Sequence, residues 1–556
     1  MSPARLGLAV AALTLAAMLA AEPRLAIAWD EGYTLGRQDR IRAWLKALAD
    51  PPAFAARWRP PALELVQPDN PPAPPLRRDE IDTRANLFSR RSLDYFWPFA
   101  RAEPHGHPPL YAILGLLGDL LTPSRAQLPR ARLGPIVAFS LTSGLICTFM
   151  SRRYGTWPGL ASAGAWALQP QLFGHGHYAT YDALLTSLWV CATFAFYKAV
   201  ESPRRNLWAV ALGVLLGWAA DTKLTGWFLP IPLLTWAALY RSRRGLQAML
   251  IGGLVAVPVA LAFNPAYWAD PIAGVARFLR SNLTRDRTIP IPVLFLGRVV
   301  MTPKASLPWY NTLLLTAIVT PFGMLMLALA GIYRSILRSR SDTFAPLVVI
   351  QWAFLLALRA LPHTPGHDGV RQFLPAFGML AIASGLGAAV LVERFPRIGR
   401  ACILLSIIEG AASIALMMPV PLSYYSPIVV GLPGATRLGM EPTYYWDGLS
   451  PEAIAFLNDK TPPGAKVAFA TFPTSWIYLQ RQGLLKAELL TGGQGSVAWY
   501  VLQNRPGAFR PEDKILASSG KPAFVASKFG VPLVWIFPIA EHRRAVYLAR
   551  QAPSPP

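Results

Sequence analysis

The chain has 556 residues, of which 53% are hydrophobic and only 15% are charged, against about 45–50% and about 25% in typical soluble proteins. This composition excludes an ordinary soluble domain. The net charge of +23 does not indicate nucleic-acid binding, because the basic residues separate long apolar runs and form no patch. The three cysteines lie inside apolar runs, which excludes a disulfide framework and a Cys-x-x-Cys metal site.

Apolar runs recur along the whole chain, and a helix needs about 20 such residues to cross a bilayer. The predicted spans are 6–28, 133–151, 156–174, 179–200, 206–222, 223–240, 246–264, 311–333, 343–361, 372–392 and 401–420. They predict an all-α polytopic membrane protein with about 11 to 13 transmembrane helices. The first run ends in Ala26-Ile27-Ala28, as signal peptides do, but the polar segment 22–24 interrupts it, so we expect a retained helix.

Short basic segments between the spans predict their orientation, because cytoplasmic loops are rich in Lys and Arg. These segments are Arg152-Arg153, Lys198 with Arg204-Arg205, Arg241 with Arg243-Arg244, Arg334 with Arg338 and Arg340, and Arg394 with Arg397 and Arg400. All of them, together with Arg5, face the cytoplasm only if both ends of 29–132 lie outside. The short apolar run 108–121 must then re-enter or lie in the interface, and Arg125, Arg130 and Arg132 fall outside, against the rule.

This topology predicts a transmembrane domain, 1–420, and a small C-terminal α/β domain, 421–556, outside the membrane. The first outer loop, 29–107, has helical periodicity at Leu35–Leu48 and near Ile81–Phe99, which predicts helices on the membrane surface.

The second outer loop, 265–310, contains an amphipathic stretch, Ile272–Leu283. In the C-terminal domain, a predicted helix at Pro451–Asp459 is followed by a strand-like run at Lys466–Phe472. We detect no internal repeat.

Unusual polar residues gather at the outer ends of the predicted spans. They are Asp30 and Glu31, His105 and His107, His175, His177 and Asp182, Asp221 and Lys223, and His363, His367, Asp368 and Arg371. Ionisable groups at the edge of an apolar core are costly unless paired or hydrated, so they mark a candidate site. Arg371 in particular stands at the start of a span, where the helix dipole disfavours a cation, and this favours an anionic ligand.

Each residue also has a structural interpretation. Asp30 and Glu31 could occupy the exposed first turn of a surface helix, Asp182 could be an N-cap, and Lys223 could extend to the interface. The histidines could be solvated or packed polar residues. His363 and His367 are four residues apart, but the intervening Pro-Gly precludes a regular helical face. We therefore predict no metal ligand, and leave a divalent metal cofactor open.

The arrangement suits a lipid whose phosphate lies at the membrane interface. Lys223 and Arg371 could neutralise the phosphate, also as a leaving group. Asp30 or Glu31 could then take the proton from an attacking hydroxyl. A single base and a phosphate leaving group predict one displacement with inversion.

Several motifs in this order resemble a known superfamily. They are Trp29-Asp30-Glu31-Gly-Tyr, His107-Pro-Pro-Leu-Tyr, Tyr178-Ala-Thr-Tyr-Asp182-Ala-Leu-Leu, Asp221-Thr-Lys223-x-x-Gly226 and Arg371-Gln-Phe-Leu-Pro375. No single motif is specific, but the ordered set over about residues 1–420 resembles the GT-C membrane glycosyltransferases. The resemblance is to the branch of dolichyl-phosphate-mannose protein mannosyltransferases and lipid A aminoarabinose transferases. The chain is thus similar to glycosyltransferase family 39.

This resemblance implies a polyprenyl-phosphate sugar donor, a hydroxyl acceptor and Asp30 as the catalytic base. It also implies that Glu31 assists, that His107 belongs to a loop closing over the site, that Asp182 lines a substrate pocket, and that Lys223 and Arg371 contact the lipid phosphate. The tail lacks the repeated carbohydrate-binding modules of eukaryotic relatives, which favours a bacterial type of enzyme in the inner membrane, with its site on the periplasmic face.

The type of sugar, hexose or pentose, and the class of acceptor, whether lipid, glycan or protein, stay open. The alternative is a polytopic transporter or lipid flippase, which matched halves with broken helices would favour, but no matched halves are visible. A non-catalytic relative is a third hypothesis, against which the intact Asp30-Glu31 pair argues.

Overall fold

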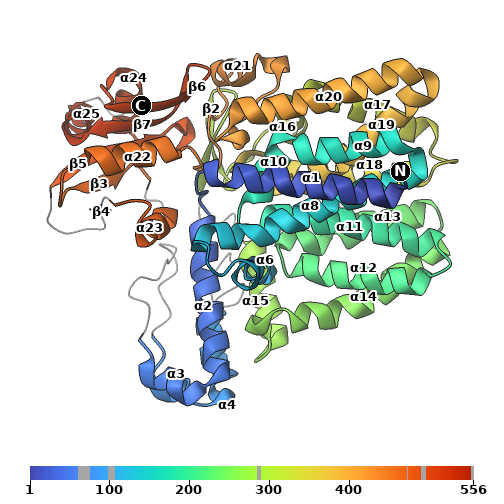
Figure 1. Cartoon of the computed structure of the whole chain (residues 1–556), viewed down its shortest axis with the longest axis horizontal. Helices are drawn as coiled ribbons and strands as arrows, with labels where there is room; N and C mark the ends of the chain where they lie inside the picture. Colours follow the sequence, from blue (N-terminus) through green and yellow to red (C-terminus); the bar gives the residue numbers. More distant parts are fainter. Residues whose placement is uncertain are drawn as a thin grey trace.

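The computed structural model describes residues 1–59, 75–97, 107–284, 290–471, 474–486, 488–489 and 496–551. Most of these residues form a bundle of apolar helices whose axes are roughly aligned (Figure 1). A smaller sheet-containing domain lies at one end of the bundle. The predicted fold class, an all-α membrane protein with a small C-terminal α/β domain, is confirmed. His105 and most of the proline-rich stretch in the first outer loop lie outside the described residues.

The helices of the bundle are α1 (Pro3–Ala21), α8 (Gln127–Tyr154), α9 (Thr156–Leu168), α10 (Pro170–His177), α11 (Tyr181–Glu201), α12 (Arg205–Ala220), α13 (Pro230–Leu239), α14 (Arg243–Ala262), α16 (Asn311–Val319), α17 (Phe322–Leu337), α18 (Phe344–Ala360), α19 (Pro375–Arg394) and α20 (Pro396–Met417). Six helices in the described part of the chain are long and apolar enough to cross a membrane, and several shorter apolar helices accompany them. The first predicted span ends early, at Arg24, because Glu22 and Pro23 begin a short 3-10 turn.

Two predicted spans, 156–174 and 311–333, are each broken into two helices at a proline, Pro170 and Pro321. A proline lacks the N–H that continues the helical ladder, so the freed backbone groups need other partners. The Gln169 side chain accepts from Leu172 N at 2.7 Å and donates to Val319 O at 3.1 Å. One side chain therefore satisfies a backbone group at each of the two helix breaks. Glu409, a carboxylate inside the apolar α20, accepts from the first two N–H groups of α17, each at 2.7 Å.

The opposite ends of the bundle differ in chemistry. Helices α1 and α8 are antiparallel, since Thr148 contacts Pro3 and Arg132 contacts Glu22, so both ends of 29–132 lie at the same end of the bundle. At the other end, the predicted basic segments lie together and pair with the few local acids, as in the contacts of Arg153 with Glu201 and Asp342. We call these the site end and the basic end.

The first outer loop lies across the site end. Helix α2 (Glu31–Ala49) runs nearly perpendicular to the bundle, with α3 (Pro51–Arg57) and α4 (Arg84–Leu87) at its far end and α5 (Arg90–Phe96) beside it (Figure 1). The run 108–121 forms two short helices, α6 (Leu110–Gly115) and α7 (Leu117–Leu121), that pack against α2 and α8.

The second outer loop contains α15 (Pro271–Leu283) and an unpredicted hairpin of strands β1 (Ile291–Phe295) and β2 (Arg298–Thr302). The buried Glu441, in the first part of the C-terminal domain, accepts from Leu294 N of this hairpin at 3.0 Å. Burial raises the pKa of Glu441 to about 7.

The C-terminal domain has a five-stranded mixed sheet in the order β4-β3-β5-β7-β6, with helices on both faces. Its strands are β3 (Lys466–Phe469), β4 (Glu488–Leu489), β5 (Val497–Gln503), β6 (Phe524–Lys528) and β7 (Val531–Pro538), and its helices, with the preceding α21, are α21 (Gly431–Arg437), α22 (Pro451–Lys460), α23 (Thr474–Arg481), α24 (Pro511–Ser519) and α25 (Ile539–Gln551). Alternate strand residues enter the two cores, so Val501 packs with α22 while Tyr500 and Leu502 pack with α24 and α25.

Candidate active site

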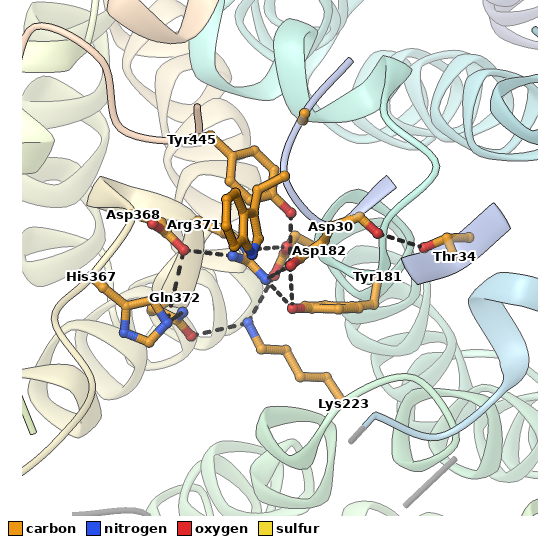
Figure 2. A network of polar contacts seen from close by, with 12 residues as sticks. Asp30, Thr34, Tyr181, Asp182, Lys223, His367, Asp368, Arg371, Gln372 and Tyr445 are labelled. Atoms are coloured by element: carbon orange, nitrogen blue, oxygen red, sulfur yellow. Dashed lines mark hydrogen bonds and ion pairs between the residues drawn. The ribbon is translucent and has the colours of Figure 1, made fainter. Parts of the chain in front are cut away.

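Arg371 is the centre of a buried polar cluster at the site end of the bundle. It lies in the 3-10 turn Gly369–Phe373 that immediately precedes α19, and its side chain is 4% exposed. Figure 2 shows its guanidinium between Asp368 on one side and Asp30 and Asp182 on the other. Nε donates to Asp182 and Nη1 to Asp368, each at 2.7 Å, while Nη2 donates to Asp30 and to the Tyr181 hydroxyl.

Asp30 is the N-cap residue of α2, but its carboxylate does not cap the helix. Instead Oδ2 accepts from the hydroxyls of Tyr181 at 2.8 Å and Tyr445 at 3.0 Å, and from Arg371. All three donors converge on Oδ2, and no hydrogen bond to Oδ1 is found among the described residues. The interpretation of Asp30 as part of an exposed helical turn is therefore wrong.

Asp182 lies in the first turn of α11, whose N-cap residue is Thr180, so Asp182 is not an N-cap. Its buried carboxylate accepts from Lys223 Nζ at 2.8 Å and from Arg371 at 2.7 Å. Lys223 also donates to Gln372 Oε1 at 3.1 Å. Two segments that are distant in the sequence are thus joined by one carboxylate, and Lys223 points inward rather than toward the interface.

A cavity of about 590 Å³ opens beside this cluster. Its wall includes Asp30, His107, Lys223 and Arg371 from the transmembrane part and Trp446 from the C-terminal domain. The ring of His107 lies 3.7 Å from that of Tyr181, centroid to centroid. The cationic side chains of the wall outnumber its two carboxylates, Asp30 and Asp368; they are Arg37, Lys223, Arg359, Arg371 and Arg505. This charge excess suits an anionic ligand.

Glu31 does not line this cavity. It is fully buried, with Oε1 accepting from Arg132 Nε at 2.7 Å and Ala179 N at 3.0 Å, and Oε2 accepting from Arg132 Nη2 at 2.7 Å and Ala28 N at 2.8 Å. Both oxygens are committed to structural partners, which does not fit the predicted catalytic role. The ion pair between Glu31 and Arg132 also explains why Arg132 lies on the outer side, against the positive-inside rule, because its charge is neutralised inside the protein.

The other predicted polar residues divide between the cavity and the packed interior. His363 and His367 line the cavity. His177 is buried, and its ring nitrogens contact the carbonyls of Phe173 and Met18 at 2.7 and 3.0 Å, so its role is packing. His175 and Asp221 are buried outside the cavity wall.

Sequence reasoning missed several residues of the site. Tyr181 lies inside the motif Tyr178-Ala-Thr-Tyr-Asp182, and its position directly before Asp182 could have suggested a place in the site. Tyr445 and Arg505 come from the C-terminal domain, where no motif stands out. Arg505 forms an ion pair with Asp368 at 3.0 Å, and the Arg371 guanidinium lies 4.5 Å from the ring centre of Tyr445. In the described part of the chain, no three His, Cys, Asp or Glu side chains are grouped to hold a metal ion.

Residues 106–268 match the model of a family described as Dolichyl-phosphate-mannose-protein mannosyltransferase. No curated protein matches the sequence. ArnT from Cupriavidus metallidurans, solved bound to undecaprenyl phosphate, is 14% identical and superposes with a TM-score of 0.52, covering 96% of this chain and 97% of that chain. The oligosaccharyltransferase AglB from Archaeoglobus fulgidus, in complex with an inhibitory peptide and a dolichol-phosphate, is 11% identical, with a TM-score of 0.47 and coverage of 96% and 76%.

The chain thus has the fold of the GT-C membrane glycosyltransferases. Residues 106–268 resemble the protein mannosyltransferase family, and the chain as a whole has the fold of ArnT; both findings agree with the resemblance inferred from the motifs. The family match includes His107, Asp182 and Lys223 but ends before Arg371 and begins after Asp30. The long apolar helices and this fold together indicate an integral membrane protein.

Proposed function

We propose that the protein is an inverting glycosyltransferase that moves a sugar from a polyprenyl-phosphate donor to a hydroxyl group of a lipid, glycan or protein. The observation that carries the proposal is the position of Arg371, which contacts Asp30 and Asp182 beside Lys223 at one end of an apolar bundle. A carboxylate base and a cationic phosphate site thus share one cavity. The undecaprenyl phosphate bound to ArnT supports a donor of this class.

In the proposed reaction, the acceptor hydroxyl attacks the anomeric carbon from the face opposite the phosphate. The new carbon–oxygen bond forms while the bond to the phosphate oxygen breaks, and its electron pair leaves with the phosphate. Asp30 takes the hydroxyl proton, using the Oδ1 that accepts no hydrogen bond from any described residue. Lys223 and Arg371 stabilise the added negative charge of the departing phosphate. One displacement inverts the anomeric configuration.

The neighbouring residues have supporting roles in this proposal. Lys223 uses two of its three donors on Asp182 and Gln372, which leaves the third for a phosphate oxygen. His107 is a substrate-binding residue at the cavity wall. Glu31 becomes a positioning residue, because it fixes the start of α2 against Arg132 and so holds the adjacent Asp30 in place. We place the site on the periplasmic face of a bacterial inner membrane.

The test is Asp30→Asn, which keeps the size of the side chain and an acceptor for the two tyrosines but removes the base. We expect turnover with a polyprenyl-phosphate sugar to fall at least about a hundredfold, as for loss of a general base, while binding of undecaprenyl phosphate persists. Asp39→Asn is the control, because Asp39 lies on the same helix outside the cavity wall and accepts hydrogen bonds from Arg42 and Gln127. Turnover of Asp30→Asn within tenfold of the parent protein would refute the assignment.

A further inference from the structure

A second cavity lies at the basic end of the bundle, far from the candidate active site. It has a volume of about 720 Å³ and lies over α11, between α8 and α12. These three helices are adjacent in Figure 1, and α11 contacts both of the others. The proposed glycosyl transfer uses no residue of this cavity.

The wall of the cavity has an excess of positive charge. Its five cationic side chains face two carboxylates, Glu201 and Asp342; the cations are Arg152, Arg153, Lys198, Arg334 and Arg338. Arg153 and Arg334 are paired with Asp342, but Arg152 has no acidic partner among the described residues. Arg334 is buried, and its Nε has no acceptor in the described part of the chain. The cavity therefore offers unused donors to an anion.

Part of the cavity wall is apolar, with Phe149, Phe194 and Leu215 among its lining residues. Leu145 on α8 and Trp208 on α12 are 41% and 37% exposed and lie in the same wall. The cavity thus opens sideways between two membrane helices. Tryptophan favours the depth of the lipid headgroups, which places the basic side chains at the membrane surface and the apolar wall beside the acyl chains.

The separation of the two cavities agrees with this placement. Arg132 at the site end and Arg152 at the basic end are on α8, and a rise of about 1.5 Å per residue puts them roughly 30 Å apart. The hydrocarbon core of a bilayer has about this thickness. The two charged layers therefore fit the two surfaces of one membrane.

We propose that this cavity binds an anionic phospholipid of the inner leaflet, with the phosphate among Arg152, Lys198 and Arg334 and an acyl chain along the groove between α8 and α12. Charge complementarity selects an anionic lipid over a zwitterionic one, as in other basic pockets between membrane helices on the cytoplasmic side. A polyprenyl phosphate is the less suitable occupant, because the proposed reaction uses that lipid at the opposite surface.

The test uses the purified full-length protein, freed of bound lipid and titrated with phosphatidylglycerol or phosphatidylcholine while native mass spectrometry counts the bound molecules. The variant is Arg152→Gln with Lys198→Gln. Arg152 has no acidic partner among the described residues, and Lys198 pairs with Glu201, which is exposed. Neither change therefore breaks a buried ion pair. The control is Arg397→Gln with Arg400→Gln, two exposed arginines at the same end outside the cavity.

We expect phosphatidylglycerol to bind at least tenfold more tightly than phosphatidylcholine. The cavity variant should lose about thirtyfold in affinity, which corresponds to about 1 kcal/mol for each removed charge, while the control changes less than threefold. A photoreactive phosphatidylglycerol should label peptides of α8, α11 or α12. Equal losses in both variants, labelling at the site end, or displacement of the bound lipid by undecaprenyl phosphate would overturn the proposal.

Discussion

A substitution that breaks the buried pair of Glu31 and Arg132 can distinguish a positioning role of Glu31 from a catalytic one. The change Glu31→Gln keeps the shape of the side chain but replaces one carboxylate oxygen by an NH₂ group. Each oxygen accepts one N–H of Arg132 and one backbone N–H. Whichever way the amide turns, two donors therefore face another donor, and Glu22, at 3.2 Å, is the one carboxylate among the described residues that still pairs with Arg132.

The expected loss of stability follows from this geometry. Removing one member of a fully buried ion pair costs about 3–5 kcal/mol, and the remaining Glu22 contact compensates the Arg132 charge in part, so we expect a loss near the lower end of this range. Arg130→Gln is the matched control, since Arg130 lies on the same helix and pairs with Asp119 at 3.2 Å in a contact whose side chains are 23% and 21% exposed, against 1% and 0% for Arg132 and Glu31. Such pairs contribute about 1 kcal/mol or less. The two changes should thus differ by several kcal/mol.

The assay is denaturant unfolding in detergent, followed by turnover measured per folded molecule. We expect Glu31→Gln to unfold at a clearly lower denaturant concentration than the parent and the Arg130→Gln control, and its folded fraction to retain turnover within about tenfold. A Glu31→Gln protein with parental stability and a hundredfold loss of turnover would refute this reasoning. It would restore the catalytic role expected from the sequence motif.

Three further predictions follow from the described contacts. Tyr445→Phe removes the hydroxyl that donates to Asp30 at 3.0 Å but keeps the ring, so turnover should fall about tenfold with the melting temperature unchanged. For the buried Glu441, whose pKa rises from 4.5 to about 7, the folded protein holds a proton that the unfolded chain releases. The free energy of unfolding should therefore fall by about 3 kcal/mol as the pH rises from 4.5 to 7, and Glu441→Gln should remove this dependence in melts across that range. In a cysteine-free background, Ser124→Cys should react with an impermeant maleimide from outside the cell, and Ser341→Cys only after permeabilisation; the reverse pattern would invert the topology.

Much of the fold could be predicted because apolar span length and basic loops are local properties. The helices at Leu35–Leu48 and Ile272–Leu283 correspond closely to α2 and α15. The breaks at Pro170 and Pro321 were not predicted, since a proline in an apolar run breaks the helix only where other groups satisfy the freed backbone. Here Gln169 and Glu409 do so, and the partners Val319 of Gln169 and Phe322 of Glu409 are distant from them in the sequence. The β1–β2 hairpin carried too weak an alternation to be predicted.

The site was partly predictable for the same reason. Asp30, Asp182, Lys223 and Arg371 are conspicuous because charges at the end of apolar spans are rare, and the structure brings all four together. Glu31 carries the same signal, yet its partner Arg132 was noted only as an exception to the topology. A motif shows that a carboxylate is unusual, but not toward which partner it turns. Tyr445 and Arg505 gave no signal, because tyrosines and arginines are common in domains outside the membrane.

The polar cluster is divided between distant parts of the chain, which has a consequence for biogenesis. Asp30 is made among the first residues, whereas Tyr445 and Arg505 are made near the end and reach the cluster only when the C-terminal domain has folded against the bundle. A chain that ends after α20 has every bundle helix and both Asp30 and Arg371, but neither of these contacts. Synthesis thus completes the membrane-spanning helices first and the cavity last, so a nascent chain inserts before its candidate active site is complete.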